Sequence, residues 1–308
     1  MKMPRSGRGG WPWNVNIKAL PSLMPDGTSW PKITVVTPSY NQGEYIEETI
    51  RSILLQGYPN LEYIIMDGGS TDQTVEVIKK YAPWIDYWVT RKDRGQSHAI
   101  NKGFQKASGD IIAWLNSDDY FLPNCLMNVA LAYSLDVRGY WVGVGSGERV
   151  DAKGHYQMIH SPSLLSFDGL MDWDNNWFIQ PACFFSRSIW HEYGNLDENL
   201  QFAMDFDLWL RFSKHCNFTL INHILCANRN HENTKTNSMR GDSFAEGCIV
   251  RFHHGGEKVA QQSIANYVNQ SQRPWKLWNR LAEVPGRRFL QFLCQFLGRK
   301  LNIKTMKK

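Results

Sequence analysis

Several signature motifs are missing from the 308-residue sequence, and each absence excludes a class of protein. The six cysteines contain no CxxC spacing, so we interpret them as reduced thiols of a cytosolic protein and expect neither a zinc site nor a disulfide framework. The P-loop spacing GxxxxGKS/T, the dinucleotide fingerprint GxGxxG and the nucleophile motif GxSxG are also absent. The sequence therefore argues against P-loop enzymes, dinucleotide enzymes and serine hydrolases.

Long hydrophobic runs are missing as well. Residues 1–13 contain no continuous apolar stretch, so we do not predict a signal peptide. The longest nearly apolar stretch, residues 289–297, is interrupted by two glutamines and is too short to span a bilayer. We therefore expect no membrane-crossing segment and a cytoplasmic location.

Basic charge is scarce in the body of the chain, although the whole protein carries a net charge of +5. Residues 1–32 contain five basic side chains and one acidic side chain, and residues 272–308 contain ten basic and one acidic. The remaining residues, 33–271, contain 19 basic and 27 acidic side chains, a net charge of −8. A basic groove on the folded body is therefore not expected, and nucleic acid is not a predicted partner.

Short apolar segments alternate with helical patterns between residues 33 and 115. The spacing predicts strands at 33–37, 61–66, 87–90 and 110–115, and helices at 44–56, from Ser70 or Asp72 to Tyr81, and at 97–107. This order indicates an α/β fold with a mostly parallel sheet and helices on both faces. From residue 256 onward the pattern indicates appended helices, broken by Pro274 and Pro285.

Polar clusters follow three of the predicted strands, at residues 38–42, 67–72 and 116–119. This position is informative because ligands of parallel α/β sheets bind beyond the carboxyl ends of the strands. Asp118 and Asp119 point to opposite sides of an extended chain, so one can bind Mg²⁺ or Mn²⁺ and the other a sugar hydroxyl or a water. Asp67 precedes two glycines and can accept a hydrogen bond from a donor such as the imide of a uracil. An ordinary solvated turn is the alternative for each cluster.

Two further polar groups lie later in the chain. Asp205 and Asp207 open an expected helix and lie about 200° apart around it, so only one of them can face a given pocket. A carboxylate there can be a general base or a simple partner of the helix dipole. His231 and Lys235 occupy a polar loop that can close over a diphosphate, although a surface histidine is an equal reading. The apolar run 181–185 can wall off an acceptor pocket.

Taken together, these residues resemble the ordered motifs of bacterial family 2 glycosyltransferases with the GT-A fold. The matching segments, in chain order, are 37–42, 67–72, 94–103, 116–119 and 204–209. Each segment is weak alone, but their order makes the resemblance specific over about residues 30–240. One departure is that the family often has Glu-Asp where this chain has Met204-Asp205. The aspartate is kept, which leaves the identity of the acceptor open.

The resemblance implies an inverting transfer from a nucleotide-diphosphate sugar, with a UDP-sugar favoured, to a glycan or lipid-linked acceptor. It implies that Tyr40 stacks on the base, that Asp67 binds the base, and that Asp205 is the general base. Asp118 would face the ribose or the metal, and Asp119 would ligate the Mg²⁺ or Mn²⁺ cofactor. The other positions that the resemblance assigns to the nucleotide sugar are Pro38, Asn41, Gly68, Arg94, Gln96, Asn101, Ser117, His231 and Lys235.

The same resemblance divides the chain into parts. We expect an N-terminal extension at 1–32, a GT-A catalytic domain at 33–255 and a basic helical extension at 256–308. Within the catalytic domain, residues 33–120 would form the nucleotide-sugar half and residues 121–255 the acceptor half. Residues 286–308 have the composition of an amphipathic helix on an anionic membrane surface, which would place the protein on the inner face of the cell membrane. A helix packed on the body or on a partner fits that composition equally well.

Two rival functions remain open at this point. A sugar-phosphate nucleotidyltransferase also combines an α/β sheet with carboxylate-bound Mg²⁺, but it should carry a lysine in the loop after its first strand, and residues 38–43 contain none. A non-catalytic protein that binds nucleotide sugars would keep the fold without the chemistry. The presence of both Asp119 and Asp205 argues against that second alternative.

Overall fold

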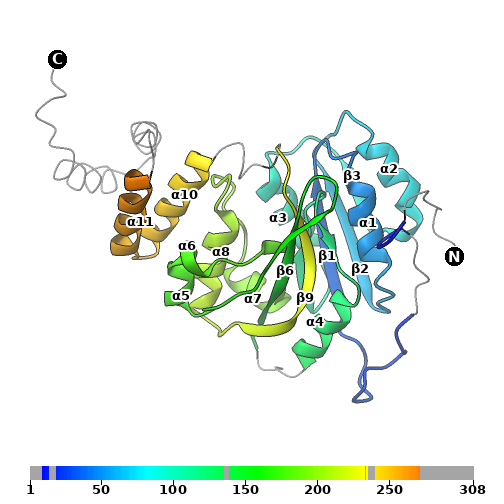
Figure 1. The fold of residues 1–308 in the computed structure, drawn as a ribbon. Coiled ribbons are helices and arrows are strands. Elements are labelled where there is room, and N and C mark those ends of the chain that lie inside the picture. The colour runs from blue at the N-terminus through cyan, green and yellow to red at the C-terminus, as the bar shows by residue number, and fades with distance from the viewer. Residues whose placement is uncertain (1–8, 14–18, 135–138, 233, 235–239, 271–308) are drawn as a thin grey trace, which may run out of the picture.

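A nine-stranded sheet forms the centre of the described part of the protein (Figure 1). The structure is a computed structural model and describes residues 9–13, 19–134, 139–232, 234 and 240–270. The strand order is β3-β2-β1-β4-β8-β6-β9-β5, and β7 pairs with β6. The strands are β1 (Ile33–Ser39), β2 (Leu61–Asp67), β3 (Tyr87–Thr90), β4 (Ile111–Trp114), β5 (Tyr120–Phe121), β6 (Val142–Val150), β7 (Tyr156–His160), β8 (Cys183–Ser186) and β9 (Thr219–Arg229).

The first half of the sheet is parallel, as the sequence predicts. β1 pairs in parallel with β2 and β4, and β2 pairs in parallel with β3. β1 is buried along its whole length, and Val35 and Val36 contribute to two different core clusters because successive side chains of a strand point to opposite faces. The predicted strands differ from the observed ones only by one or two residues at their ends.

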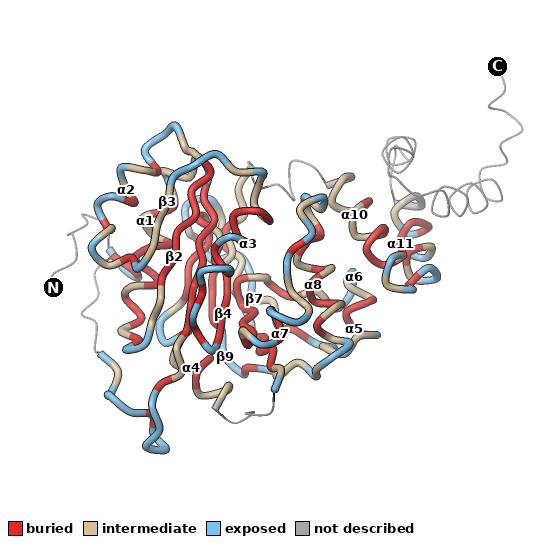
Figure 2. Tube along the Cα trace, turned by 180° about the vertical axis from the view of Figure 1, so that it is seen from behind, coloured by how far each residue is buried: buried red, intermediate tan, exposed pale blue. Residues whose placement is uncertain are grey.

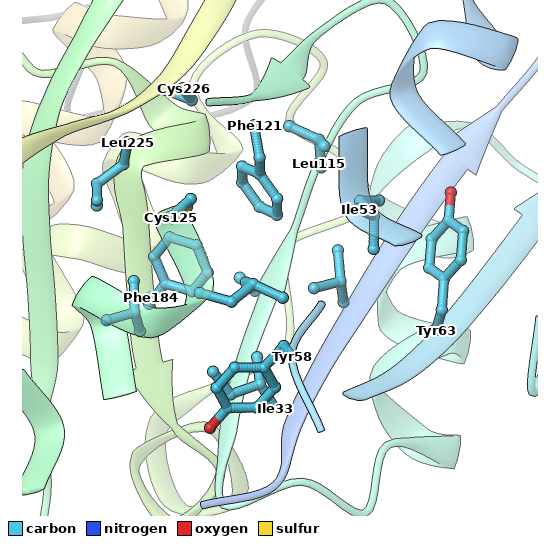
Figure 3. Close-up of a cluster of buried hydrophobic side chains, with 14 of the residues drawn as sticks. Ile33, Ile53, Tyr58, Tyr63, Leu115, Phe121, Cys125, Phe184, Leu225 and Cys226 are labelled. Atoms are coloured by element: carbon cyan, nitrogen blue, oxygen red, sulfur yellow. The ribbon is translucent and has the colours of Figure 1, made fainter. Parts of the chain in front are cut away.

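Helices cover both faces of this sheet. One core cluster contains residues of α1, α2 and α4, and Figure 3 shows part of it, with Ile53, Phe121 and Phe184 among the packed side chains. The other cluster contains residues of α3, α5, α7 and α8 (Figure 2). The helices are α1 (Ile46–Leu54), α2 (Thr74–Tyr81), α3 (Gln96–Lys106), α4 (Cys125–Ser134), α5 (Phe167–Met171), α6 (Trp173–Asn176), α7 (Arg187–Tyr193), α8 (Met204–Ser213), α10 (Arg240–His253) and α11 (Glu257–Gln270), with 3₁₀ turns η1 (Ala82–Trp84) and η2 (Gln180–Ala182).

The second half of the sheet is mixed, because β8 runs antiparallel between β4 and β6 while β6 and β9 are parallel. This half brings the end of β9 back over the polar loop that follows β4, since β9 also pairs with β5. The aromatic residues Phe184 and Phe185 belong to β8 and are buried in the two core clusters.

The helices α10 and α11 pack beside α5, α6 and α8 at one end of the molecule (Figure 1). Arg251 of α10 is buried and donates hydrogen bonds to Met171 O at 3.1 Å and to Asp174 Oδ1 at 2.7 Å. The division of the chain at residues 32, 120 and 255 stays a prediction. No helix among the described residues is long and apolar enough to cross a bilayer. The segment 286–308 lies outside the described residues.

Helix α3 approaches β1 so closely that one position requires glycine. A Cβ atom added to Gly103 would lie 2.4 Å from Val36 Cγ1 and 3.0 Å from Val36 Cγ2, and Val36 is fully buried. The close approach matters for the cavity described below, because α3 begins at Gln96, which lines that cavity.

We predict that Gly103→Ala lowers the free energy of unfolding. Overpacking a buried site costs about 1–3 kcal/mol, and this cost is larger than the gain of about 1 kcal/mol in helix propensity. Urea denaturation measures the difference. The exposed neighbour Lys102 provides the control, because Lys102→Ala should change stability by less than about 0.5 kcal/mol. A Gly103→Ala variant as stable as the wild type would contradict the packing argument.

Candidate active site

A cavity of about 930 Å³ opens at the carboxyl ends of β1, β2 and β4. Its position confirms that the polar clusters after these strands come together. The predicted site residues that line it are Pro38, Tyr40, Gly68, Gln96, Ser117, Asp118, Asp119 and Asp205. The predicted site residues that do not line it are Asn41, Asp67, Arg94, Asn101 and His231. Lys235 lies outside the described residues.

The loops after β1 and β2 are tied to each other by side chains. Asn41, whose φ of 52° is left-handed, donates its backbone N–H to Ser70 Oγ at 2.8 Å, and its Oδ1 accepts from the N–H of Thr71 at 2.9 Å. Tyr40 beside it is 61% exposed on the rim of the cavity. Asn41 thus shapes the rim, and Tyr40 is available to contact a planar ligand.

Asp67 lies beneath the turn that follows β2. Its carboxylate accepts hydrogen bonds from the backbone N–H groups of Gly69 and Ser70 and from the hydroxyls of Ser70 and Thr90. Three of these bonds go to Oδ2, so Oδ1 keeps room for a further donor. The base-binding role of Asp67 stays a prediction, and its visible role is to fix the turn that presents Gly68 to the cavity.

The predicted cap of α2 is only partly correct. The helix begins at Thr74 rather than at residue 71 or 73. Asp72 does accept from the N–H and the hydroxyl of Thr74, and its other oxygen accepts from the N–H of Gly43. Ser70 instead bonds to Asn41 and Asp67. Ser70 therefore joins the loop after β1 to the loop after β2 and does not cap α2.

Three predicted residues from segment 94–103 have different surroundings. Gln96 lines the cavity and donates to Asn116 Oδ1 at 2.7 Å. Asn101 is buried and exchanges two hydrogen bonds with the backbone of Leu196, at 2.8 and 2.9 Å. Arg94 forms an ion pair with Glu198 at 2.6 Å and keeps 69% of its side chain exposed. Asn101 and Arg94 therefore hold the loop before α8, and their assignment to the nucleotide sugar stays a prediction.

The two adjacent aspartates after β4 differ in environment. Asp118 lies at the cavity with its Oδ2 3.1 Å from His231 Nε2, and His231 packs against the ring of Tyr45. Asp119 is buried and accepts from the N–H of Arg229 at 2.8 Å and from the side chains of Asn228 and Asn116. Burial, together with repulsion from Asp118, raises the pKa of Asp119 well above its usual range. The site therefore favours a compensating positive charge.

The donor set suits a cation that is shared with a substrate. In the part of the chain that the structure describes, no three His, Cys, Asp or Glu side chains come together as a metal-ligand cluster. Mg²⁺ and Mn²⁺ bind nucleotide enzymes through one or two carboxylates plus phosphate oxygens. Asp118 and Asp119 both line the cavity and supply two carboxylates for that pattern, and Asp119 also accepts three hydrogen bonds from the protein.

Arg229 is a central residue that sequence reasoning missed. Its side chain is 2% exposed, forms an ion pair with Glu48 at 2.7 Å, and donates to Asp118 O at 3.0 Å and Ala152 O at 3.0 Å. The guanidinium also lies over the rings of Tyr45 and Tyr120. The only signal in the sequence is a basic residue at the end of an apolar strand, next to the polar loop of His231.

Asp205 and Asp207 separate as the helical spacing predicts. Asp205 lines the cavity, and Asp207 forms ion pairs with Arg211 and His254, both at 2.9 Å. Burial, with a smaller contribution from the charge of Glu246, raises the pKa of Asp205 to about 6. Burial also disfavours the charge on Asp207, but the hydrogen bond from His254 and the charge of Arg211 outweigh it and hold the pKa of Asp207 below its usual value.

Glu246 of α10, also missed from sequence, supports the start of α8. Its carboxylate accepts from three consecutive backbone N–H groups, those of Gln201, Phe202 and Ala203, at 2.7–3.0 Å. These three groups directly precede α8, which begins at Met204. Glu246 therefore fixes the start of the helix and with it the position of Asp205, the second residue of α8. A carboxylate at a helix N-terminus is favourable because it meets the positive end of the helix dipole.

An aromatic wall completes the cavity on the side of α6. Trp173, Trp177 and Phe178 line it, and the ring of Trp173 stacks on Phe206 with centroids 5.1 Å apart. Of the apolar run 181–185, only Pro181 lines the cavity, because the rest of that run belongs to η2 and the buried strand β8. The wall that the sequence assigns to 181–185 is therefore supplied mainly by residues 173–180.

The fold and the position of the cavity define a family of enzymes. The family model described as "Glycosyl transferase family 2" matches residues 34–193, more than half of the chain, so the chain belongs to this family and is a glycosyltransferase. The resemblance stated from the sequence is confirmed.

Individual relatives agree with this assignment. An uncharacterized glycosyltransferase of Rickettsia typhi is 28% identical over 221 residues, which cover 70% of this chain and 69% of the relative. The crystal structure of S. aureus TarS in complex with UDP-GlcNAc superposes with a TM-score of 0.62 at 16% identity, covering 87% of this chain and 81% of that one. The mannosyltransferase PcManGT from Pyrobaculum calidifontis, solved with GDP-Man and Mn²⁺, gives a TM-score of 0.55 at 17% identity over 93% of this chain and 90% of that one. These neighbours confirm the GT-A fold.

We predict that Arg229→Met lowers the free energy of unfolding by about 3–5 kcal/mol, because removing one partner leaves the Glu48 carboxylate without its compensating charge. Urea denaturation measures this loss. Adding Glu48→Gln should recover part of it, because the two residues share one interaction. The exposed pair of Lys80 and Glu47 provides the control, since Lys80→Met should cost less than about 1 kcal/mol. Equal losses for Arg229→Met and Lys80→Met would refute the central role of Arg229.

Proposed function

We propose that this glycosyltransferase transfers a sugar from a nucleotide-diphosphate sugar to an acceptor hydroxyl with inversion of the anomeric centre, assisted by a divalent metal. The observation that carries the proposal is that one cavity contains carboxylates from two separate elements. Asp118 comes from the end of β4 and Asp205 from the start of α8. A single displacement requires this arrangement, with the leaving group on one side of the sugar and the base on the other.

In the proposed step, one bond to the anomeric carbon forms while another breaks, and a side chain of the cavity takes the proton. Asp205 Oδ accepts the proton of the acceptor hydroxyl while that oxygen forms a bond to the anomeric carbon. The bond between the anomeric carbon and the β-phosphate oxygen breaks, and the nucleoside diphosphate leaves with the electron pair. The raised pKa of Asp205, about 6, suits a general base near neutral pH because it keeps enough basicity to take a proton.

The donor is proposed to occupy the side of the cavity formed by the loops after β1, β2 and β4. Tyr40 would stack on the base, and Asp67 would bind it through the free position on Oδ1. Asp119 and Asp118 would hold a Mg²⁺ or Mn²⁺ ion, with His231 beside them near the diphosphate, and that ion would neutralise the charge that develops there. A UDP-sugar is favoured, in keeping with the UDP-GlcNAc complex of TarS, while the GDP-Man and Mn²⁺ complex of PcManGT supports the metal.

The acceptor is proposed to be a glycan or a lipid-linked glycan that enters along the aromatic wall toward Asp205. Trp173 and Trp177 offer the large apolar surfaces that are typical of such pockets. Contact with the inner face of the cell membrane through residues 286–308 is part of this proposal. It rests on the basic and apolar composition of that segment alone.

We predict that Asp205→Asn abolishes most of the turnover, because an amide cannot accept the proton. The expected loss is about 10²–10⁴-fold. The measurement is release of nucleoside diphosphate from a panel of UDP-, GDP-, CDP- and dTDP-sugars with Mn²⁺, with water as the acceptor. Asp207→Asn is the matched control on the same helix, since it should lower stability through its lost ion pairs and keep the turnover.

Two outcomes would contradict the proposal. If the wild type released no nucleotide from any donor of the panel, the proposed chemistry would be refuted. If Asp205→Asn kept full turnover while Asp207→Asn lost it, Asp207 would be the base.

We also predict that kcat/KM rises with pH and reaches half of its plateau near pH 6. Below that pH Asp205 is protonated and cannot act as a base, and above it the carboxylate is free to accept a proton. Glu246→Gln should move the midpoint to lower pH, because it removes a negative charge that raises the pKa of Asp205. A pH–rate series on both proteins measures the shift. A midpoint that moves upward, or a rate that falls between pH 5 and 7, would contradict the assignment.

A further inference from the structure

Arg149, near the end of β6, presents a guanidinium group to the cavity without a protein partner. Its Nε is buried and finds no hydrogen-bond acceptor among the described residues, and the side chain forms no ion pair with any of them. The guanidinium carbon lies 5.5 Å from the centroid of the Trp177 ring. A buried donor without an acceptor is costly, so such a group calls for an explanation.

Other arginines in the described core differ from Arg149 in this respect. Arg51 donates to Pro12 O, Trp13 O and Tyr81 Oη, Arg229 binds Glu48, and Arg251 binds Asp174. Each of these three buried arginines therefore donates hydrogen bonds to oxygen atoms of the protein. Arg149 and Arg229 both line the cavity, together with four aspartates (Asp93, Asp118, Asp119 and Asp205), but of the two only Arg229 has an acidic partner among the described residues.

The side chain of Arg149 is held in place by an aromatic scaffold. Trp177 stacks on His160 with ring centroids 3.5 Å apart, and His160 Nε2 lies 2.5 Å from Trp177 O. Arginine stacks well on aromatic faces and keeps its planar fork free for a carboxylate or a phosphate. The guanidinium is thus preorganised for an anion that the protein itself does not supply.

The position of Arg149 indicates which substrate carries that anion. Trp177 belongs to the aromatic wall of residues 173–178, and Trp173 at the other end of this wall stacks on Phe206, next to Asp205. The wall therefore connects Arg149 with the proposed base, which must contact the acceptor. The loops proposed for the nucleotide follow β1, β2 and β4, whereas Arg149 belongs to β6, which β8 separates from β4 in the sheet order.

We propose that Arg149 forms a subsite for an anionic group of the acceptor, so that the acceptor is a saccharide bearing a carboxylate or a phosphate. This inference rests on the proposed function, because it assumes that the acceptor approaches Asp205 along the aromatic wall. The guanidinium supplies paired N–H donors to the anion, and the apolar surroundings strengthen each charge-assisted hydrogen bond.

The test compares three methyl glycosides that differ only at C6 of glucose: the neutral glucoside, the glucuronide and the 6-phosphate. Their Kd values are measured by ligand-observed NMR with wild-type protein in saturating UDP and Mn²⁺. We expect at least one anionic glycoside to bind about tenfold more tightly than the neutral one, and the preferred anion identifies carboxylate or phosphate as the natural group. Equal binding of all three, or binding of neither anionic probe, overturns the proposal.

Variants of Arg149 assign any preference to this residue. Arg149→Met keeps the apolar stem and should reduce the preference to within about twofold, and Arg149→Lys should retain part of it because the charge remains. Lys153→Met is the matched control, since it removes an exposed cation from the same hairpin outside the cavity and should keep the wild-type preference. A preference that survives in Arg149→Met overturns the proposal.

Calorimetry with UDP, GDP, CDP and dTDP separates the two proposals. If the wild type binds none of these nucleotides in the presence of Mn²⁺, the proposed function fails. If a nucleotide binds and the glycosides do not differ, only the anionic subsite fails. A tenfold loss of nucleotide affinity in Arg149→Met would assign the arginine to the diphosphate of the donor and likewise overturn the subsite.

Discussion

The buried guanidinium of Arg229 is the interaction on which the geometry of the site depends. It joins α1 through Glu48, the loop after β4 through Asp118 O, and the turn between β6 and β7 through Ala152 O. Its own N–H holds Asp119. Because these segments come from distant parts of the chain, the loop with the two aspartates has its shape only when β9 has closed over it. The second half of the sheet therefore shapes the loop that is proposed to bind the donor in the first half.

The aspartates near the cavity have identical side chains, but their surroundings differ and give them different properties. Asp207 forms an ion pair with Arg211 and accepts a hydrogen bond from His254, and its pKa is lowered, whereas Asp205, two residues earlier, faces a cavity and has an elevated pKa. Asp119 accepts three hydrogen bonds from the protein, while Asp118 lies beside the imidazole of His231. The same carboxyl group thus forms an ion pair in Asp207 and is the proposed base in Asp205, and the neighbouring groups decide which of the two pKa values is raised and which is lowered.

The sequence was sufficient for the parts of the fold that are local. Strand and helix order follows from apolar periodicity, and clusters such as 116–119 are visible because their members are adjacent in the chain. Arg229, Glu246 and Arg149 could not be predicted, because their partners are distant in sequence and leave no spacing pattern. Glu48 and Arg229, for example, are separated by 181 positions. Asn101 and Arg94 illustrate the reverse case, where a motif position contacts the loop before α8 rather than the cavity.

Glu246 of α10 accepts hydrogen bonds from the residues before α8. The position of the proposed base, Asp205, is therefore supported from α10. The segment matched by the family model ends at residue 193, so both Asp205 and Glu246 lie beyond it. The loops proposed for the donor lie within that segment and are held by other contacts. Substitutions in the C-terminal helices would consequently act on the proposed base and leave the loops proposed for the nucleotide unchanged. The two proposed substrate sides therefore have separate structural supports, one inside the segment that the family model matches and one beyond it.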